Sequence, residues 1–225
     1  MAEAALKHGY TNSTATEGRS VVKRYRGPDR DVRQHNEVAA LSGVAGQICV
    51  PPLLAVGDGK VTLGLVAGRP GQELLEEKPK DVLYAAGRLA RRLATVDLSS
   101  VAALATAWDG TVLVHGDFGP QNLLLDQDTA KPTALLDWEF AGRGDGLYDL
   151  ATTAMAGGFG PEEEARLLGE YGLDPTMGRE GLRAMRWVVL YFEAAWSLVM
   201  HGLHGSGGYD YADHSQKMFA RMADT

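Results

Sequence analysis

Residues 113–126 read L-V-H-G-D-F-G-P-Q-N-L-L-L-D, and L-L-D-W-E-F follows at residues 135–140. In both stretches a run of branched apolar residues leads to an aspartate, Asp117 in the first and Asp137 in the second. Short apolar runs bounded by turn residues are typical of buried strands. The spacing therefore predicts short strands that hold Asp117, Asn122 and Asp137 on a rigid platform.

These three side chains suggest a particular chemistry. Asp117 and Asn122 lie at the two ends of the predicted loop, and a hairpin would bring Asp137 close to Asn122. A carboxylate and an amide oxygen on converging backbone segments suit Mg²⁺, which also binds waters and nucleotide phosphates. Asp117 is then left to accept a proton from a hydroxyl group. Each aspartate taken alone is equally explained as a turn former.

Composition limits the class of protein. The chain has 225 residues, of which 45% are hydrophobic, enough for one sizeable core or two small lobes. The single cysteine, Cys49, excludes an internal disulfide. The N-terminus does not read as a secretory signal, and the most apolar window, Trp187–Val199, is too short to cross a bilayer. We expect a cytoplasmic protein that does not act at a membrane.

The net charge of −7 disfavours nucleic acid as a partner, and it is unevenly distributed. Residues 1–70 contain nine Lys and Arg against six Asp and Glu, a balance of +3. Residues 71–225 carry the remaining balance of −10. This asymmetry favours two lobes with different ligands, although ordinary surface variation explains it equally well.

The first part of the chain, residues 1–68, predicts a small antiparallel sheet with one helix. Gly-containing turns separate short β-branched runs, and Ala67–Gly71 reads as a linker. The predicted strands are Leu6–His8, Ser13–Thr16, Ser20–Tyr25 and the two apolar runs on either side of Gly57–Gly59. A helix over Val32–Leu41 would be capped by Asp31.

The second part, residues 69–225, is predicted to be mainly helical, which makes the whole chain α+β. Apolar residues recur at helical spacing, and Pro161 with three following glutamates marks a helix start. The predicted helices are Lys80–Val96, Tyr148–Ala156, Pro161–Tyr171, Gly181–Leu203 and Asp210–Met222. Trp187, Tyr191 and Trp196 are expected to pack in the core, with lining of a substrate cleft as the alternative.

The stretch Val112–Ala151 resembles the phosphotransferase family of aminoglycoside and choline kinases, which share the H-G-D-x4-N loop and an aspartate on the next strand. The resemblance implies a two-lobed fold like that of protein kinases, with a small N-terminal sheet and a mainly helical C-terminal lobe. Asp117 would be the base, Asn122 and Asp137 would bind Mg²⁺, and His115 would order the loop.

A weaker resemblance extends over residues 5–156. Lys23 takes the place of the family's strand lysine, which contacts nucleotide phosphates, and Glu37 that of its helix partner. Gly9–Ser13 is similar to the turn that covers the nucleotide, which implicates Tyr10, Thr11, Asn12 and Ser13. Val66 and Gly68 would belong to the hinge against which adenine lies.

Other polar residues are open to two readings. Asp149 is expected to anchor the loop, either as a helix N-terminal charge or as a partner of backbone amides. Glu139 would be structural or would face a cationic substrate, and Asp145 and Glu193 are further candidates for the substrate side. His201 and His204 are spaced for a metal, but the sequence offers no third ligand.

Together these features imply a kinase that transfers the γ-phosphate of ATP or GTP to a small-molecule hydroxyl. The acidic C-terminal part predicts an amine-bearing acceptor, such as an aminoglycoside or another basic antibiotic or metabolite. The chain is shorter than typical members of the family, which suggests an open cleft or one completed by a second subunit, hence a possible homodimer. The alternative is an inactive nucleotide-binding regulator of the same fold. The chain lacks the H-R-D, D-F-G and A-P-E motifs of protein kinases, which argues against a protein kinase.

Overall fold

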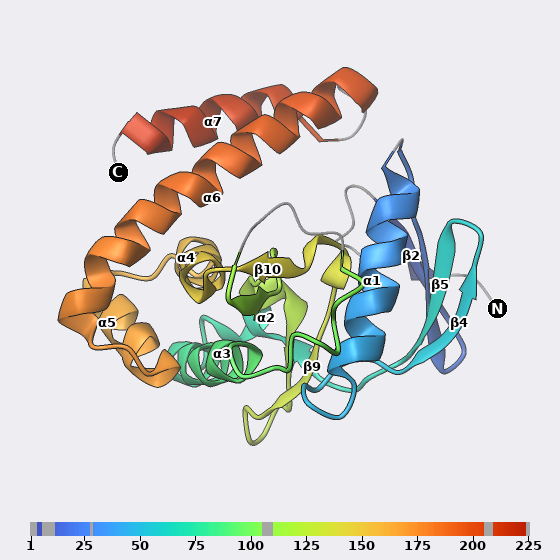
Figure 1. Ribbon diagram of the computed structural model, residues 1–225, viewed down its shortest axis with the longest axis horizontal. Coiled ribbons are helices and arrows are strands. Elements are labelled where there is room, and N and C mark those ends of the chain that lie inside the picture. Colours follow the sequence, from blue (N-terminus) through green and yellow to red (C-terminus); the bar gives the residue numbers. More distant parts are fainter. Residues whose placement is uncertain (1–3, 6–11, 28, 105–109, 205–208, 224–225) are drawn as a thin grey trace.

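The computed structural model describes residues 4–5, 12–27, 29–104, 110–204 and 209–223 and has an N-terminal and a C-terminal part (Figure 1). The N-terminal part is an antiparallel sheet of five strands, in the order β1-β2-β3-β5-β4, with one helix. Its elements are β1 (Ala4–Ala5), β2 (Ser13–Glu17), β3 (Ser20–Arg24), α1 (Arg30–Val44), β4 (Leu53–Gly57) and β5 (Lys60–Gly64).

The predicted sheet and its hairpins are confirmed where the structure describes them. Glu17 pairs with Ser20 across one two-residue turn, and Gly57 pairs with Lys60 across another. The central glycines of these turns have positive φ, as tight hairpins require. The strand predicted at Leu6–His8 lies outside the described residues.

The start predicted for the first helix is wrong. Helix α1 begins at Arg30 and follows Asp29, so Asp31 lies inside the first turn and does not cap the helix. The Asp31 carboxylate pairs with the exposed Arg30 side chain instead. A negative charge in the first turn still favours the helix dipole, which is why the sequence signal resembled a cap.

The C-terminal part is mainly helical, as predicted. Its strands and short 3-10 turns are β6 (Arg69–Pro70), β7 (Val112–Val114), η1 (Pro120–Asn122), β8 (Leu123–Leu125), β9 (Pro132–Leu135), η2 (Trp138–Phe140) and β10 (Gly142–Gly144). Its helices are α2 (Gly71–Leu74), α3 (Pro79–Leu93), α4 (Gly146–Ala156), α5 (Pro161–Tyr171), α6 (Pro175–His204) and α7 (Tyr211–Ala223). The predicted helices are all present, and α6 starts one and a half turns earlier than the sequence indicated.

Two small sheets hold the residues singled out from the sequence. Strands β8 and β9 form the predicted hairpin, and β6 adds to its edge. Strand β7 pairs instead with β10, a strand that the sequence did not reveal. The backbone N–H of Leu136 donates to the carbonyl oxygen of Asn122 at 2.8 Å, so the chain around Asp137 is tied directly to the metal-ligand candidate.

The predicted linker is part of the C-terminal sheet. Gly68 has φ of 150°, and a Cβ placed on it would lie 2.6 Å from the Thr133 hydroxyl oxygen. Only glycine lets the chain pass this close before β6 begins at Arg69. The boundary predicted between residues 68 and 69 stays a prediction, and one buried apolar cluster contains residues from both sides of it. Within the described part of the chain, no helix is both long and apolar enough to span a bilayer.

Candidate active site

The H-G-D loop, residues 115–122, is fixed by the first turn of α4. The Asp149 carboxylate accepts hydrogen bonds from the backbone N–H groups of His115, at 2.8 Å, and Gly116, at 3.1 Å. Burial raises the pKa of Asp149 to about 7. Each N–H group nevertheless needs an acceptor oxygen, which the ionised carboxylate provides. The prediction that Asp149 anchors the loop through backbone amides is confirmed.

His115 orders the loop from inside the core. Its ring is fully buried, its Nε2 lies 2.8 Å from the Leu136 carbonyl oxygen, and the ring packs edge-on against Trp138. Burial lowers the pKa of His115 to about 4, so the imidazole is neutral. About two turns into α4, the Thr153 hydroxyl donates to the Phe118 carbonyl at 2.5 Å. The loop is therefore held from both sides.

Asp117 and Asn122 are in direct contact. The Asn122 amide Nδ2 donates to Asp117 Oδ2 at 2.8 Å and to the Asp117 carbonyl at 2.9 Å. Burial, together with the nearby Asp137 carboxylate, raises the pKa of Asp117 to about 8. The amide thus orients the carboxylate, while Asn122 Oδ1 takes part in none of the hydrogen bonds found among the described residues.

Asp137 follows β9 in the left-handed conformation, with φ and ψ both 65°. Such a conformation is uncommon for a residue other than glycine and is often found at functional sites. Its Oδ1 contacts the Lys23 ammonium. Burial acts to raise the pKa of Asp137, but the charge of Lys23 outweighs it and holds that pKa below the usual value. Asp137 is therefore an ionised carboxylate that contacts Lys23 through Oδ1.

Lys23 and Glu37 form the ion pair expected from the sequence. Lys23 Nζ lies 2.5 Å from Glu37 Oε2, and the Tyr25 hydroxyl also donates to that oxygen. Both charged side chains are buried, so screening by solvent is small. Burial acts to lower the pKa of Lys23, but the surrounding carboxylates outweigh it and keep the ammonium charged.

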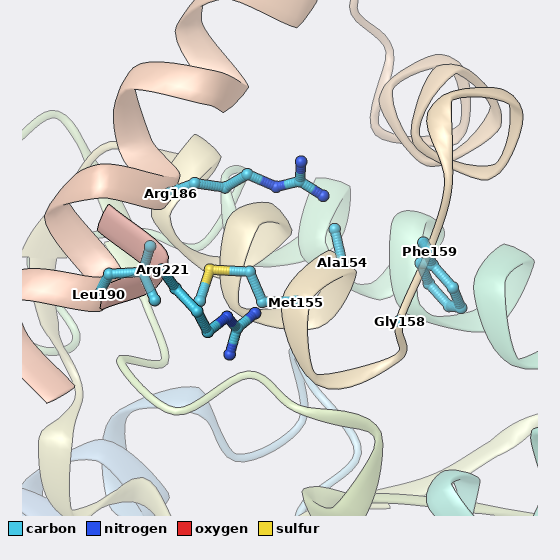
Figure 2. Close-up of a pocket in the computed structure, with 7 residues that line it drawn as sticks. All are labelled: Ala154, Met155, Gly158, Phe159, Arg186, Leu190 and Arg221. Carbon is cyan, nitrogen blue, oxygen red and sulfur yellow. The ribbon is translucent and has the colours of Figure 1, made fainter. Parts of the chain in front are cut away.

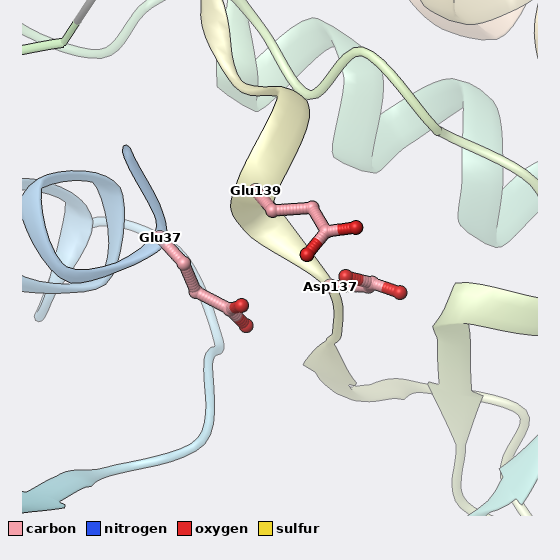
Figure 3. A group of neighbouring side chains, drawn as sticks. All are labelled: Glu37, Asp137 and Glu139. Carbon is pink, nitrogen blue, oxygen red and sulfur yellow. The ribbon is translucent and has the colours of Figure 1, made fainter. Parts of the chain in front are cut away.

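Glu139 lies beside Glu37 and Asp137 (Figure 3), and side chains of the N-terminal part contact it. Its carboxylate accepts from Asn12 Nδ2 at 2.7 Å, lies 3.2 Å from Lys23 Nζ and is 3.3 Å from Arg33 Nη1. The side chain is 1% exposed. The prediction that Glu139 faces a cationic substrate is therefore corrected to its structural alternative, because cations of the protein already surround it.

Three carboxylates meet at this point: oxygens of Glu37, Asp137 and Glu139 lie within 4.8 Å of one another. The Lys23 ammonium contacts all three and supplies the local positive charge. A metal ion would therefore be held on the outer side of this cluster. The ionised Asp137 and the Asn122 amide oxygen are hard oxygen ligands that suit Mg²⁺ there.

Of the other residues predicted to contact nucleotide, Asn12 contacts this cluster. Asn12 is buried and its side chain bridges Glu139 and Arg33, the latter at 2.9 Å. Ser13 begins β2. Val66 is half-buried and Gly68 is exposed, both just before β6. Tyr10 and Thr11 lie outside the described residues.

The residues predicted for the acceptor side, Glu193 and Asp145, lie on α6 and directly before α4. Glu193 on α6 adds to the forces that raise the pKa values of Asp117 and Tyr148, so its charge acts on the H-G-D loop. Its carboxylate lies 3.6 Å from His214 Nε2 of α7. Asp145 is exposed and caps α4 by accepting from the Leu147 N–H at 2.9 Å. This gives Asp145 a structural role that the sequence did not predict.

The aromatic residues of α6 are placed differently from the prediction. Trp187 and Tyr191 are 48% and 47% exposed, so they are not core residues. Trp196 is half-buried and packs edge-on against Tyr211. His201 is exposed, and the side chain of His204 is not among those that the structure describes. Among the described residues, the potential metal cluster contains no histidine.

A pocket of about 360 Å³ lies between α4, α6 and α7 (Figure 2). It is lined by Ala154, Met155, Gly158, Phe159, Arg186, Leu190 and Arg221. None of these residues belongs to the H-G-D loop, and the two arginines would favour an acidic group over an amine. We therefore place the reaction at the loop and not in this pocket.

Sequence reasoning missed three members of the buried network: Tyr25, Arg33 and Asn36. Arg33 contacts Glu139, and Asn36 Nδ2 lies 3.3 Å from the Ala141 carbonyl, so both tie α1 to η2. Their signal in the sequence is weak because helix faces routinely carry arginine and asparagine. The spacing of apolar residues in α1 indicates which face of the helix is buried, but not which polar residues that face contacts.

Comparison with known proteins agrees with this geometry. Residues 98–188 match the model of the phosphotransferase enzyme family. No curated protein matches the sequence. All of the chain superposes on the GDP complex of aminoglycoside 2'-phosphotransferase-IIIa, covering 93% of that structure, with a TM-score of 0.80 and 14% identity.

Two further structures show the same fold. A choline/ethanolamine kinase family protein from Mesorhizobium loti matches all of this chain and 87% of its own, with a TM-score of 0.71 and 19% identity. Macrolide 2'-phosphotransferase MphH from Brachybacterium faecium matches 99% of this chain and 92% of its own, with a TM-score of 0.68 and 18% identity. Residues 98–188 thus match the phosphotransferase enzyme family, and the chain as a whole has the two-part, kinase-like fold of the aminoglycoside phosphotransferases.

Proposed function

We propose that the protein transfers the γ-phosphate of ATP or GTP to a hydroxyl group of a small molecule. The observation that carries this proposal is the hydrogen bond between Asp117 and Asn122, placed beside the Lys23–Glu37 ion pair and the ionised Asp137. Phosphoryl transfer depends mainly on positioning and on stabilising charge. These residues supply a base, a fixed cation and oxygen ligands within one site.

Asp137 and Asn122 would hold Mg²⁺, which would neutralise phosphate charge when bound. The fit rests on two features of these residues: Asp137 is ionised and partly exposed, and Asn122 donates through Nδ2, which leaves its amide oxygen for a ligand. Lys23, held by Glu37, would orient the nucleotide phosphates. Asn12, Ser13, Val66 and Gly68, with Tyr10 and Thr11, would contact the rest of the nucleotide.

Asp117 would accept the proton of the acceptor hydroxyl. Asn122 fixes the Asp117 carboxylate, and Asp149 fixes the loop backbone that carries it. The raised pKa of Asp117 makes it a better proton acceptor than an ordinary aspartate once it is ionised. A divalent cation beside it would favour that ionised form.

The acceptor side supports an amine-bearing substrate. Glu193 and Asp117 place negative charge near the reacting hydroxyl, and such a surface concentrates cations. The compared structures include aminoglycoside and macrolide phosphotransferases and a choline/ethanolamine kinase family protein, so the class of acceptor differs among proteins of this fold. We also propose that the protein acts in the cytoplasm and binds neither nucleic acid nor a membrane.

The direct test is phosphorylation of an acceptor panel with Mg·ATP and Mg·GTP in separate reactions. The panel contains aminoglycosides, macrolides, choline-like amines, and neutral sugars as controls. Transfer of labelled γ-phosphate to one acceptor is expected, with the Asp117→Asn protein as the inactive control. Nucleotide binding without transfer to any acceptor would instead support the inactive regulator.

The metal ligands can be tested without an acceptor. Asp137→Ala should abolish the tightening of nucleotide binding by Mg²⁺, because it removes the only carboxylate oxygen that we place at the metal. Calorimetric titration of nucleotide with and without Mg²⁺ measures this difference, and Asp126→Ala, on an exposed turn, is the matched control. A Mg²⁺ effect of normal size in Asp137→Ala would place the metal elsewhere.

A further inference from the structure

Helix α6 carries an apolar face that stays largely exposed in the described part of the molecule. Half of the large hydrophobic side chains that are markedly exposed lie on this one helix: Met177, Trp187, Tyr191, Phe192, Leu198, Val199 and Leu203. Figure 1 shows α7 running back along α6 at the edge of the C-terminal part. The largest apolar patch on a protein surface is often a site of interaction.

The residues of this face follow a seven-residue repeat. Ala184, Tyr191 and Leu198 are seven apart, and Val188 and Ala195 each follow one of the first two by four residues. Apolar residues at alternating intervals of four and three form the seam of a helix pair. Such a seam accepts a second helix along its length, which an isolated surface residue does not.

Charges are kept off this seam. Arg186 and Glu193 are the only Arg, Lys, Asp or Glu residues between positions 184 and 203, and both are engaged elsewhere. Arg186 pairs with Glu164 of α5, and Glu193 faces His214 of α7. The polar side of α6 is therefore turned toward its own C-terminal part, and the side turned away is apolar.

We propose that two copies of this chain pair through α6, with the two helices antiparallel across a two-fold axis. In this arrangement the bulky Trp187 of one copy would lie near Leu198 and Gly202 of the other, and Ala195 would lie near the axis. Large side chains would then face small ones, and the two helix dipoles would oppose each other favourably.

The available area reaches the lower bound for a specific pair. A buried aromatic side chain contributes about 150–250 Å², and three of them on this face are about half exposed. With Leu198, Val199 and Leu203, each copy offers on the order of 500 Å² of apolar area. A pair would bury on the order of 1,000 Å², the lower bound for a specific interface.

A second copy fits this face better than a lipid surface does. Helices that lie on membranes carry lysine or arginine along the side opposite the apolar face. Here that opposite side is occupied by α4, α5 and α7, and the chain carries a net charge of −7, which anionic lipids repel. A partner that is itself apolar and uncharged along one helix matches the seam, and α6 of another copy is such a partner.

Sedimentation velocity tests the pairing independently of catalysis, since it requires neither nucleotide nor acceptor. We expect twice the chain mass of 24.1 kDa at micromolar concentrations. Leu198→Glu should weaken the pair by at least about 100-fold, because it places an unpaired charge in the interface. The control is Leu54→Glu, which changes a residue of similar exposure on β4 and should leave the mass unchanged.

Two additional measurements keep the test decisive. Tyr191→Gln serves as a second seam variant if circular dichroism shows that Leu198→Glu has lost helix. Ala195→Cys in a Cys49→Ser background should give a covalent dimer with a short bismaleimide, whereas Lys217→Cys on α7 should not. A monomeric wild-type protein, a dimer that survives both seam variants, or a monomer that binds neutral phosphatidylcholine vesicles through Leu198 would overturn the proposal.

Discussion

The two sides of the H-G-D loop are built differently. On the nucleotide side, Lys23, Arg33 and Asn12 reach across from the N-terminal part to Glu139 and Asp137, and nearly all of these side chains are buried. On the acceptor side, α6 and α7 pack on each other through a small apolar cluster. The Glu193–His214 pair, a polar contact between these two helices, is partly exposed.

This difference separates two tasks. The buried ion pairs between the two parts of the chain fix the positions of the groups that we propose to bind phosphate, and fixed charges stabilise a transition state without reorganisation. The acceptor side has few such constraints, so substitutions there can change the substrate without disturbing the phosphate site. We therefore expect changes on the nucleotide side to affect every acceptor equally and changes on α6 to affect some acceptors only.

The largest effect should come from the residue between the two sides. Asp117→Asn should lower turnover by about 10²–10⁴-fold, the usual range for loss of a general base. Nucleotide affinity should stay within a few-fold of the wild type, because the side-chain shape is kept and Asp137 remains. Steady-state kinetics and nucleotide titration measure the two quantities separately. Near-normal turnover on the best acceptor would remove Asp117 from the base role.

The next effect concerns the buried link between α1 and η2. Arg33→Met leaves Glu139 without one of its cations, and breaking a buried ion pair costs about 3–5 kcal/mol of unfolding free energy. Urea denaturation measures the loss. Arg88→Met, which removes an exposed pair with Glu170, is the matched control and should cost about 1 kcal/mol or less.

A double-mutant cycle with Glu139→Gln sharpens this prediction. The double variant should recover part of the stability, because no uncompensated buried charge remains. Losses that simply add would show that Arg33 and Glu139 do not interact. Since Glu139 lies beside Lys23 and Arg33 contacts Glu139, nucleotide affinity should fall in both single variants, whichever acceptor is used.

The sequence predicted the site better than the network that supports it. Asp117, Asn122, Asp137, Lys23 and Glu37 were identified because a local motif and strand position constrain them. Arg33 and Asn36 act through contacts with residues more than 100 positions away. No local pattern records such pairings, so they become visible only when α1 is docked against η2.

The strand that the sequence did not predict, β10, was missed for a similar reason. The helices of the C-terminal part have strong periodicity and were predicted well, whereas β10 is three residues long and exists only because β7 pairs with it. The exposed face of α6 was also misread. An apolar helical repeat indicates that something covers it, but it does not say whether the cover is the same chain or another one.

A smaller effect is expected at the anchor of the loop. Asp149→Asn keeps one acceptor oxygen but turns an N–H₂ group toward a backbone N–H donor, of His115 or Gly116. Leaving one buried donor unsatisfied costs about 1–3 kcal/mol of unfolding free energy. Thermal unfolding should show the loss, and turnover should fall because the loop that carries Asp117 is less firmly held. Unchanged stability would mean that water or another group replaces the lost acceptor.

The smallest predicted effect tests the acceptor side. Glu193→Gln should raise the KM of a cationic acceptor several-fold and leave kcat nearly unchanged, because Glu193 acts through its charge and touches no reacting atom. Its side chain is 40% exposed, so solvent limits the effect. In the wild type, KM should rise with ionic strength as screening weakens the attraction, and the variant should lose part of this dependence.

The control is Asp213→Asn, which removes the same charge from an exposed residue of α7 that pairs with Lys217, and it should change KM little. If the best acceptor is neutral and its KM does not change with ionic strength in either protein, the prediction of a cationic acceptor is wrong. The proposal for the nucleotide side does not depend on that result.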